Sequence, residues 1–257
     1  MDDVNSMLEV FGILYLGRDD IEPQNQLGRI TMRCPYGILR DMYNVTTVDE
    51  TRETIKFGDE FDIRDIKSPF PYLHGPSGLE FDLFGGAYKG DLIDFFEPLL
   101  FEHRDEAFLE ELRLDARDGT GEIRVLMGFY AHATIAQVEV RITNSRGNVV
   151  YGSVAASNNI FDHDRATSMF FLKDQHQEIT VETDGLIPLA RSRVAVPYKS
   201  VLLLDISLHV NGQPLSANMC FPARKIGVPE PKDVGDLSIT VKWNALKHDS
   251  EDDMELD

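Results

Sequence analysis

The chain has 257 residues, of which 42% are hydrophobic, and its 44 acidic and 25 basic side chains give a formal net charge of -19. This length suffices for one large β domain or two modest ones. So acidic a surface repels phosphate backbones and anionic lipid headgroups. We therefore expect no nucleic acid and no membrane as partner, and a basic protein surface fits the charge better. The plainest interpretation is that the charge only keeps the protein soluble.

The sequence also bears on the compartment. The first residues contain acids and no basic stretch before the apolar positions, unlike a secretory signal. No apolar run approaches the roughly 18 residues that cross a bilayer. The two cysteines, Cys34 and Cys220, are too few for a disulfide framework and fit a reducing compartment, although their spacing does not decide whether they pair. A cytoplasmic or nuclear protein is expected.

Apolar residues recur mainly with a period of two, which is typical of β-strands. The first stretch, 7–17, is apolar at nearly every position and predicts a strand buried on both faces. Residues 137–157 look like a hairpin around a turn at 144–147. In chain order, the strands predicted from this pattern fall within residues 7–17, 54–66, 78–86, 121–130, 137–157, 178–183, 186–196, 202–210 and 237–243.

Residues 90–119 are the one segment that favours a helix. Phe108, Leu109 and Leu112 stand at helical spacing, and Pro98 interrupts the half before them. The segment is strongly acidic, so it also provides the expected binding site for a basic partner. The acids assigned to that site are Asp105, Glu106, Glu110 and Glu111.

These patterns predict an all-β protein, an antiparallel β-sandwich or barrel-like fold with one short acidic helical insertion at about 90–119. We expect a single β-rich domain over residues 1–246. Residues 247–257 should form a disordered acidic tail, because they offer too little apolar surface to offset the entropy of ordering them.

Two arginines, Arg191 and Arg193, would share one face if their segment is extended. Two cations on one face could bind an anion. More often such arginines pair with nearby acids, of which this chain has many. Both interpretations stay open at this point.

Motifs for catalysis and metal binding are missing. The sequence contains no G-x-S-x-G, no Walker A and no H-E-x-x-H. Asp162, His163 and Asp164 stand together, with His176 further along, but neighbours on a strand point to opposite faces, so no zinc cluster is expected. In a loop, Asp162 and Asp164 could offer oxygens to calcium, although a solvated loop is the commoner outcome. We expect no catalytic residue, no metal and no cofactor.

Several stretches together resemble a known family. They are D-G-L-I-P-L-A-R-S-R-V-A-V (184–196), F-F-L-K-D (170–174) and A-T-I-A-Q-V-E-V-R-I (133–142), joined by similar segments at 8–22, 75–86 and 235–244. Their order resembles a cereal-rich plant family known as a C-terminal domain of unknown function in grass proteins. The resemblance implies an all-β fold without an established activity. Some relatives are joined to ribosome-inactivating rRNA N-glycosylase domains, which suggests a role in plant defence or toxin biology.

The chain itself lacks the glycosylase signature. Glu106 and Ala107 begin like the E-A-x-x-R motif, but Leu109 and Glu110 stand at the two positions where the arginine is found. We therefore expect a non-enzymatic β-sandwich binding module that acts through protein–protein contacts. The alternative is an enzyme whose site is assembled from residues distant in sequence. A pocket of converging polar residues with shifted pKa values would favour that alternative.

Overall fold

The computed structural model describes residues 7–17, 28–33, 39–46, 58–59, 69–71, 78–83, 88–92, 107–115, 121–143, 148–162 and 166–244. They form four antiparallel sheets and one 3-10 helix, Gln175–Gln177. The predicted all-β antiparallel fold is confirmed, and within the described ranges the sheets are open rather than closed into a barrel. No helix in the described part of the chain is long and apolar enough to cross a membrane.

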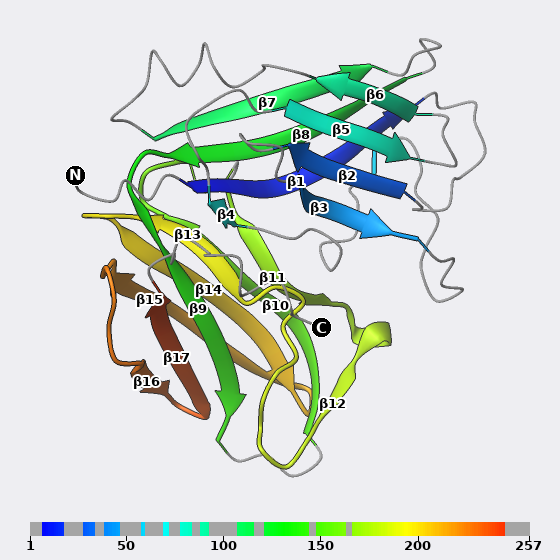
Figure 1. Cartoon of the computed structure of the whole chain (residues 1–257). Helices are drawn as coiled ribbons and strands as arrows, with labels where there is room; N and C mark the ends of the chain where they lie inside the picture. The colour runs from blue at the N-terminus through cyan, green and yellow to red at the C-terminus, as the bar shows by residue number, and fades with distance from the viewer. Residues whose placement is uncertain are drawn as a thin grey trace.

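Two four-stranded sheets occupy the upper half of Figure 1. The first sheet has the order β4-β1-β8-β7, and the second has the order β3-β2-β5-β6. The strand β1 is buried on both faces over residues 7–11, as the sequence predicts, whereas buried and half-buried residues alternate over 12–16. The strands are β1 (Met7–Gly17), β2 (Gly28–Arg33), β3 (Leu39–Val45), β4 (Phe70–Pro71), β5 (Gly78–Leu83), β6 (Tyr88–Leu92), β7 (Phe108–Asp115) and β8 (Gly121–Tyr130).

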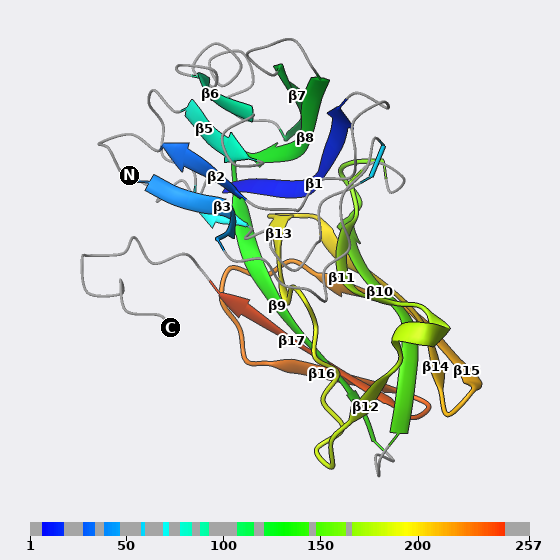
Figure 2. The same ribbon diagram turned by 90° about the vertical axis from the view of Figure 1, so that its right-hand side faces the viewer.

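The other two sheets pack face to face and form what we call the C-terminal sandwich. One sheet has the order β11-β10-β14-β15, with β12 beside β10, and the other has the order β13-β9-β17-β16. Figure 2 shows the two sheets as separate layers. The strands are β9 (Ala133–Ile142), β10 (Asn148–Asn158), β11 (Ser168–Lys173), β12 (Ile179–Val181), β13 (Arg193–Pro197), β14 (Val201–Val210), β15 (Gln213–Pro222), β16 (Glu230–Val234) and β17 (Leu237–Asn244).

The alternation of apolar and polar residues determines where the core of this sandwich lies. Alternate residues of a strand point to one face of its sheet, so an alternating sequence buries its apolar half. The prediction for 202–210 and 237–243 is confirmed, because the apolar residues on one face of each strand are buried: Leu202, Leu204, Ile206 and Leu208 on β14, and Leu237, Ile239, Val241 and Trp243 on β17.

The predicted hairpin at 137–157 is wrong. β9 pairs with β13 and β17, whereas β10 pairs with β11, β12 and β14, so the two strands belong to opposite sheets. Both strands bury valines in the same core, as Val138 and Val150 show. An alternating pattern reports which face is buried and leaves the neighbouring strand undetermined, so a hairpin and a connection across the core look alike in sequence.

The helical insertion predicted at about 90–119 is also wrong where the structure describes it. Phe108–Asp115 forms β7, which pairs antiparallel with β8 over its whole length. Phe108 stacks on Phe129 of β8 at 4.6 Å between ring centroids, and Leu112 is buried. A spacing of four residues, as between Phe108 and Leu112, fits a strand face as well as a helix face, and pairing with β8 decides between them.

β8 continues into β9 through Ala131 and His132, so one stretch of chain links the upper sheets to the C-terminal sandwich (Figure 1). The backbone N–H of Tyr198 donates to the carbonyl of His132 at 3.0 Å and holds this bend. An apolar cluster fills the junction beside it. It consists of Met7, Phe11, Tyr130, Ala133, Ile135, Ala166 and Ala195.

Some predictions fall outside the described residues. These are most of the strand at 54–66, the tail at 247–257, and the residues Asp105, Glu106 and Cys34. Cys220 lies on β15 and carries an exposed free thiol. The single domain over 1–246 stays a prediction.

Candidate functional site

A buried polar cluster lies where β1 meets the C-terminal sandwich, and we call it the junction cluster. Its centre is Glu9, which is fully buried. The Ser168 hydroxyl donates to the Glu9 carboxyl at 2.6 Å, and the backbone N–H of Ala195 donates to it at 2.5 Å. The cluster comprises Glu9, Tyr130, Asn158, Ser168 and Arg191.

Arg191 is the cation of the junction cluster. One terminal nitrogen of its guanidinium lies 2.8 Å from the Glu9 carboxyl, and the other donates to the carbonyl of Val10 at 2.9 Å. Only 6% of Arg191 is exposed. Its Nε makes no hydrogen bond within the described part of the chain. Arg191 therefore ties the segment before β13 to two consecutive residues of β1.

Tyr130 is the member of the junction cluster that lies at the end of β8. Its hydroxyl accepts a hydrogen bond from the Asn158 side chain at 2.9 Å. Its ring stacks on the Phe161 ring, with 5.3 Å between the ring centroids. A Cβ added at Gly128 would lie 2.8 Å from the ring edges of both Phe11 and Phe161. The rings thus fill the space around the polar groups and leave no room for an additional methyl group.

Burial shifts the titration of all three ionisable groups. Desolvation raises the pKa of Glu9 above its usual 4.5, against the opposing effect of the Arg191 charge. Desolvation also lowers the pKa of Arg191 and raises the pKa of Tyr130 well above 10. The cluster is therefore a costly arrangement whose hydrogen bonds offset the loss of hydration.

Polar residues from distant positions do converge here, as the enzyme alternative requires. However, Glu9 and Ser168 are 0% exposed, and Tyr130, Asn158 and Arg191 are at most 6% exposed. A substrate cannot reach a carboxyl or hydroxyl enclosed on every side. The geometry supports a structural role, in which the cluster fixes β1 to the sandwich.

Sequence reasoning missed Glu9, which is 182 residues away from Arg191. The signal was present, because Glu9 is the only acid in the apolar stretch 7–17. A carboxyl in a strand buried on both faces requires a partner. The identity of that partner depends on which strands meet, and the local pattern does not encode this.

The structure separates the two arginines of the predicted anion site. Arg191 is buried against Glu9, whereas Arg193 is exposed at the start of β13. Of the two interpretations, pairing with an acid describes Arg191.

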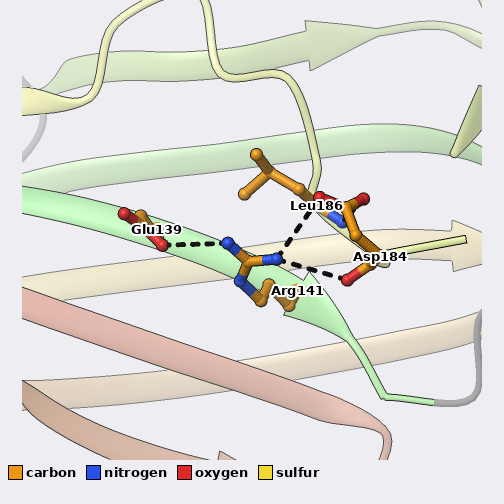
Figure 3. A network of polar contacts seen from close by, with 4 residues as sticks. All are labelled: Glu139, Arg141, Asp184 and Leu186. Atoms are coloured by element: carbon orange, nitrogen blue, oxygen red, sulfur yellow. Dashed lines mark hydrogen bonds and ion pairs between the residues drawn. The ribbon is translucent and has the colours of Figure 1, made fainter. Parts of the chain in front are cut away.

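A second, exposed polar cluster surrounds Arg141 on β9, as Figure 3 shows. Its guanidinium lies 3.2 Å from the Glu139 carboxylate and 3.4 Å from the Asp184 carboxylate, and it also donates to the Asp184 carbonyl at 3.3 Å. The Asp184 side chain accepts from the N–H of Leu186 at 3.0 Å, and Gly185 follows it at φ +74. The turn at 184–185 is therefore clamped to β9.

The acids expected to bind a partner divide between the faces of β7. Glu110 shares a face with Phe108 and Leu112, while Glu111 points to the other face. Glu111 lies 3.5 Å from Arg113 and 3.8 Å from Arg124, and Glu122 also pairs with Arg124. A helix would have gathered these acids on one side, whereas the strand does not bring Glu110 and Glu111 together.

A different group of exposed acids gathers at one end of the C-terminal sandwich. The N–H of Ile142 donates to the Gly185 carbonyl, and the N–H of Thr143 donates to the Asp236 carbonyl, both at 2.9 Å. The loop after β12 and the turn between β16 and β17 therefore meet at the end of β9. We call this region the acidic end and define it by Glu182, Asp184, Asp233 and Asp236, all exposed.

Metal binding finds no support in the described residues, where no group of three His, Cys, Asp or Glu side chains is placed to hold an ion. Asp162 is exposed, while His163 and Asp164 lie outside the described residues. The calcium interpretation for this loop stays a prediction.

Comparison with known proteins identifies the family to which the chain belongs. A family described as a domain of unknown function (DUF6598) matches residues 98–242, which is more than half of the chain. The chain belongs to the DUF6598 family. The match confirms the part of the resemblance that implied a domain of unknown function. It covers β7 through most of β17, so Arg191 lies inside the DUF6598 match and its partner Glu9 lies outside.

No curated protein matches the chain. Among solved structures, it is similar to extended synaptotagmin 2, in a structure of its SMP domain and two C2 domains, with 10% identity and a TM-score of 0.30, covering 95% of this chain and 57% of that one. It is also similar to human GIVD cytosolic phospholipase A2, with 10% identity and a TM-score of 0.27, covering 95% of this chain and 30% of that one. Similarity at these scores carries no conclusion about this protein.

Proposed function

We propose that this DUF6598 protein is a non-enzymatic binding module that acts through protein–protein contacts. The observation that carries the proposal is the division of polar groups between two places. The polar side chains that converge in the junction cluster are sealed from solvent, whereas the acidic end is exposed. The enclosed groups support the fold, and the exposed groups remain accessible to a partner.

The partner we propose is a basic protein surface. Glu182 and Asp184 come from one loop, and Asp233 and Asp236 come from the β16–β17 hairpin, so two elements present acids at one end. Such a field accelerates the encounter with a cationic patch and weakens as salt shortens the screening length. The family resemblance suggests a ribosome-inactivating domain as the basic partner, because its rRNA-binding face must be cationic, and a role in plant defence would follow.

The test compares two variants with equal changes in charge. The first is Glu182→Gln, Asp233→Asn and Asp236→Asn, which leaves the Asp184 clamp in place. The control is Glu110→Gln, Glu111→Gln and Asp205→Asn, where Asp205 is an exposed residue of β14. Association with a purified ribosome-inactivating domain is followed by stopped flow at two salt concentrations.

We expect the first variant to associate about tenfold more slowly at low salt, and the control to stay within about twofold of wild type. The difference should shrink at high salt. Equal rates for all three proteins would contradict a role for the acidic end. A slow control beside an unchanged first variant would assign binding to β7.

A further inference from the structure

The loop between β15 and β16, residues 223–229, is unusual for an exposed segment. Ile226 is 73% exposed and Val228 is 83% exposed, the highest values of any large hydrophobic residue in the described part of the chain. Gly227 separates them. Exposed apolar surface concentrated in one segment is typical of an interaction site.

The loop is held in place at its base. The N–H of Ala223 donates to the carbonyl of Ser200 at 3.0 Å, and the Thr134 hydroxyl contacts the carbonyl of Lys225 at 3.4 Å. A Cβ added at Gly227 would lie 3.8 Å from Cδ1 of Trp243, so the middle of the loop rests on the buried indole. The Trp243 Nε1 makes no hydrogen bond within the described residues. The two exposed apolar side chains therefore belong to a loop that is held against the sandwich along its length.

The loop and a neighbouring segment are rich in basic side chains, although the protein as a whole is acidic. The segments 198–200 and 223–232 contain four cations, Lys199, Arg224, Lys225 and Lys232, and one acid, Glu230. The ammonium of Lys225 lies 5.5 Å from the centre of the Tyr198 ring, which brings the two segments together. Arg224 pairs with Glu230 at 3.1 Å, so Lys199 and Lys225 remain as cations without an ion pair to Glu230.

We propose that the loop at residues 223–229 docks the protein on an anionic lipid surface. Ile226 and Val228 enter the boundary between headgroups and acyl chains, while Lys199 and Lys225 remain among the anionic headgroups. A protein partner would need about 800 Å² of fitted surface on each side. Two exposed apolar side chains offer much less, whereas a fluid lipid surface can close around them.

The overall charge of -19 does not prevent this contact. Electrostatic forces are screened over about 8 Å at physiological salt. β9 and β14 each have ten residues, and ten strand residues span about 33 Å. The acidic end, which lies at the other end of these strands, is therefore several screening lengths from the loop at residues 223–229. Local charges decide the interaction.

The proposal is tested with the full chain and lipid vesicles of two compositions, phosphatidylcholine alone and phosphatidylcholine mixed with phosphatidylserine. Sedimentation with vesicles measures binding. Fluorescence of Trp243, the only tryptophan, reports on the loop that covers it. The test variants are Ile226→Ser with Val228→Ser, and Lys199→Gln with Lys225→Gln. The matched controls are Leu172→Ser, at a residue 59% exposed on β11, and Lys242→Gln, at an exposed residue of β17.

We expect wild type and both controls to bind the anionic vesicles with a change in Trp243 fluorescence. The serine variant should bind about tenfold or more weakly, because two aliphatic side chains no longer leave water. The glutamine variant should lose its preference for anionic over neutral lipid. Near-ultraviolet circular dichroism confirms that each variant is folded.

Two results would overturn the proposal. One is that wild type does not bind anionic vesicles, or binds them no better than the serine variant. The other is that soluble polyglutamate changes Trp243 fluorescence while vesicles do not, which would assign the loop to an acidic protein partner. The outcome is independent of the proposed function, because that function rests on the opposite end of the sandwich.

Discussion

Arg191 and Arg141 occupy chemically similar sites in very different surroundings. Each arginine faces a glutamate, at 2.8 Å for Arg191 and 3.2 Å for Arg141, and each also contacts a backbone carbonyl. The Arg191 side chain is 5% exposed, whereas that of Arg141 is 38% exposed. The comparison teaches that burial, rather than residue type, determines whether a charged cluster stabilises the fold or remains accessible at the surface.

The largest expected effect is on the buried side of the comparison. Glu9→Ala removes the acceptor for Ser168, Ala195 and Arg191 at once. We expect a loss of about 3–5 kcal/mol in the free energy of unfolding, measured with urea, because these groups are left buried without a partner. Glu9→Gln retains a carbonyl oxygen and should recover more than half of that loss. A cost below about 1 kcal/mol for Glu9→Ala would show that the junction cluster is not needed for stability.

Packing around the junction cluster should be nearly as sensitive. Gly128→Ala places a methyl group 2.8 Å from the Phe11 and Phe161 rings, so the rings must move. We expect a cost of about 1–3 kcal/mol in thermal or urea unfolding. The control is Gly227→Ala, where the nearest atoms lie at 3.6 and 3.8 Å. Equal stability of the two variants would mean that the junction is loosely packed.

The buried site should also make the stability of the protein depend on pH. Because burial raises the pKa of Glu9 above 4.5, the folded state favours the protonated carboxyl. Its contribution to stability is fully present below about pH 4.5 and is lost as the pH rises through the raised pKa. Urea midpoints of wild type and Glu9→Gln should therefore converge as the pH rises. A gap that widens with rising pH would indicate a lowered pKa instead.

The smallest effect on stability is expected at the exposed site. Arg141→Gln breaks contacts to Glu139 and Asp184 whose side chains are 47% and 55% exposed. We expect a change of about 0–1 kcal/mol in the free energy of unfolding, because solvent screens exposed pairs. A loss as large as that of Glu9→Ala would erase the distinction between the two arginines.

The sequence predicted the strands better than their pairing. The period of two identified β14 and β17 correctly, because burial of one face is a local property. It assigned β9 and β10 to one hairpin and β7 to a helix, because partners in a sheet are chosen by contacts between distant segments. For the same reason Arg191 could be flagged as a paired cation while its partner Glu9 was missed.

The central claim is that stability resides in the junction cluster and binding resides at the acidic end. Two quantities test it, the urea midpoint of unfolding and the rate of association with the ribosome-inactivating domain at low salt. Both are measured for Glu9→Gln and for the triple variant Glu182→Gln, Asp233→Asn and Asp236→Asn. We predict that Glu9→Gln lowers the midpoint and keeps the rate, and that the triple variant keeps the midpoint and lowers the rate. If the triple variant associates as fast as wild type, or if Glu9→Gln slows association while folded, the claim is contradicted.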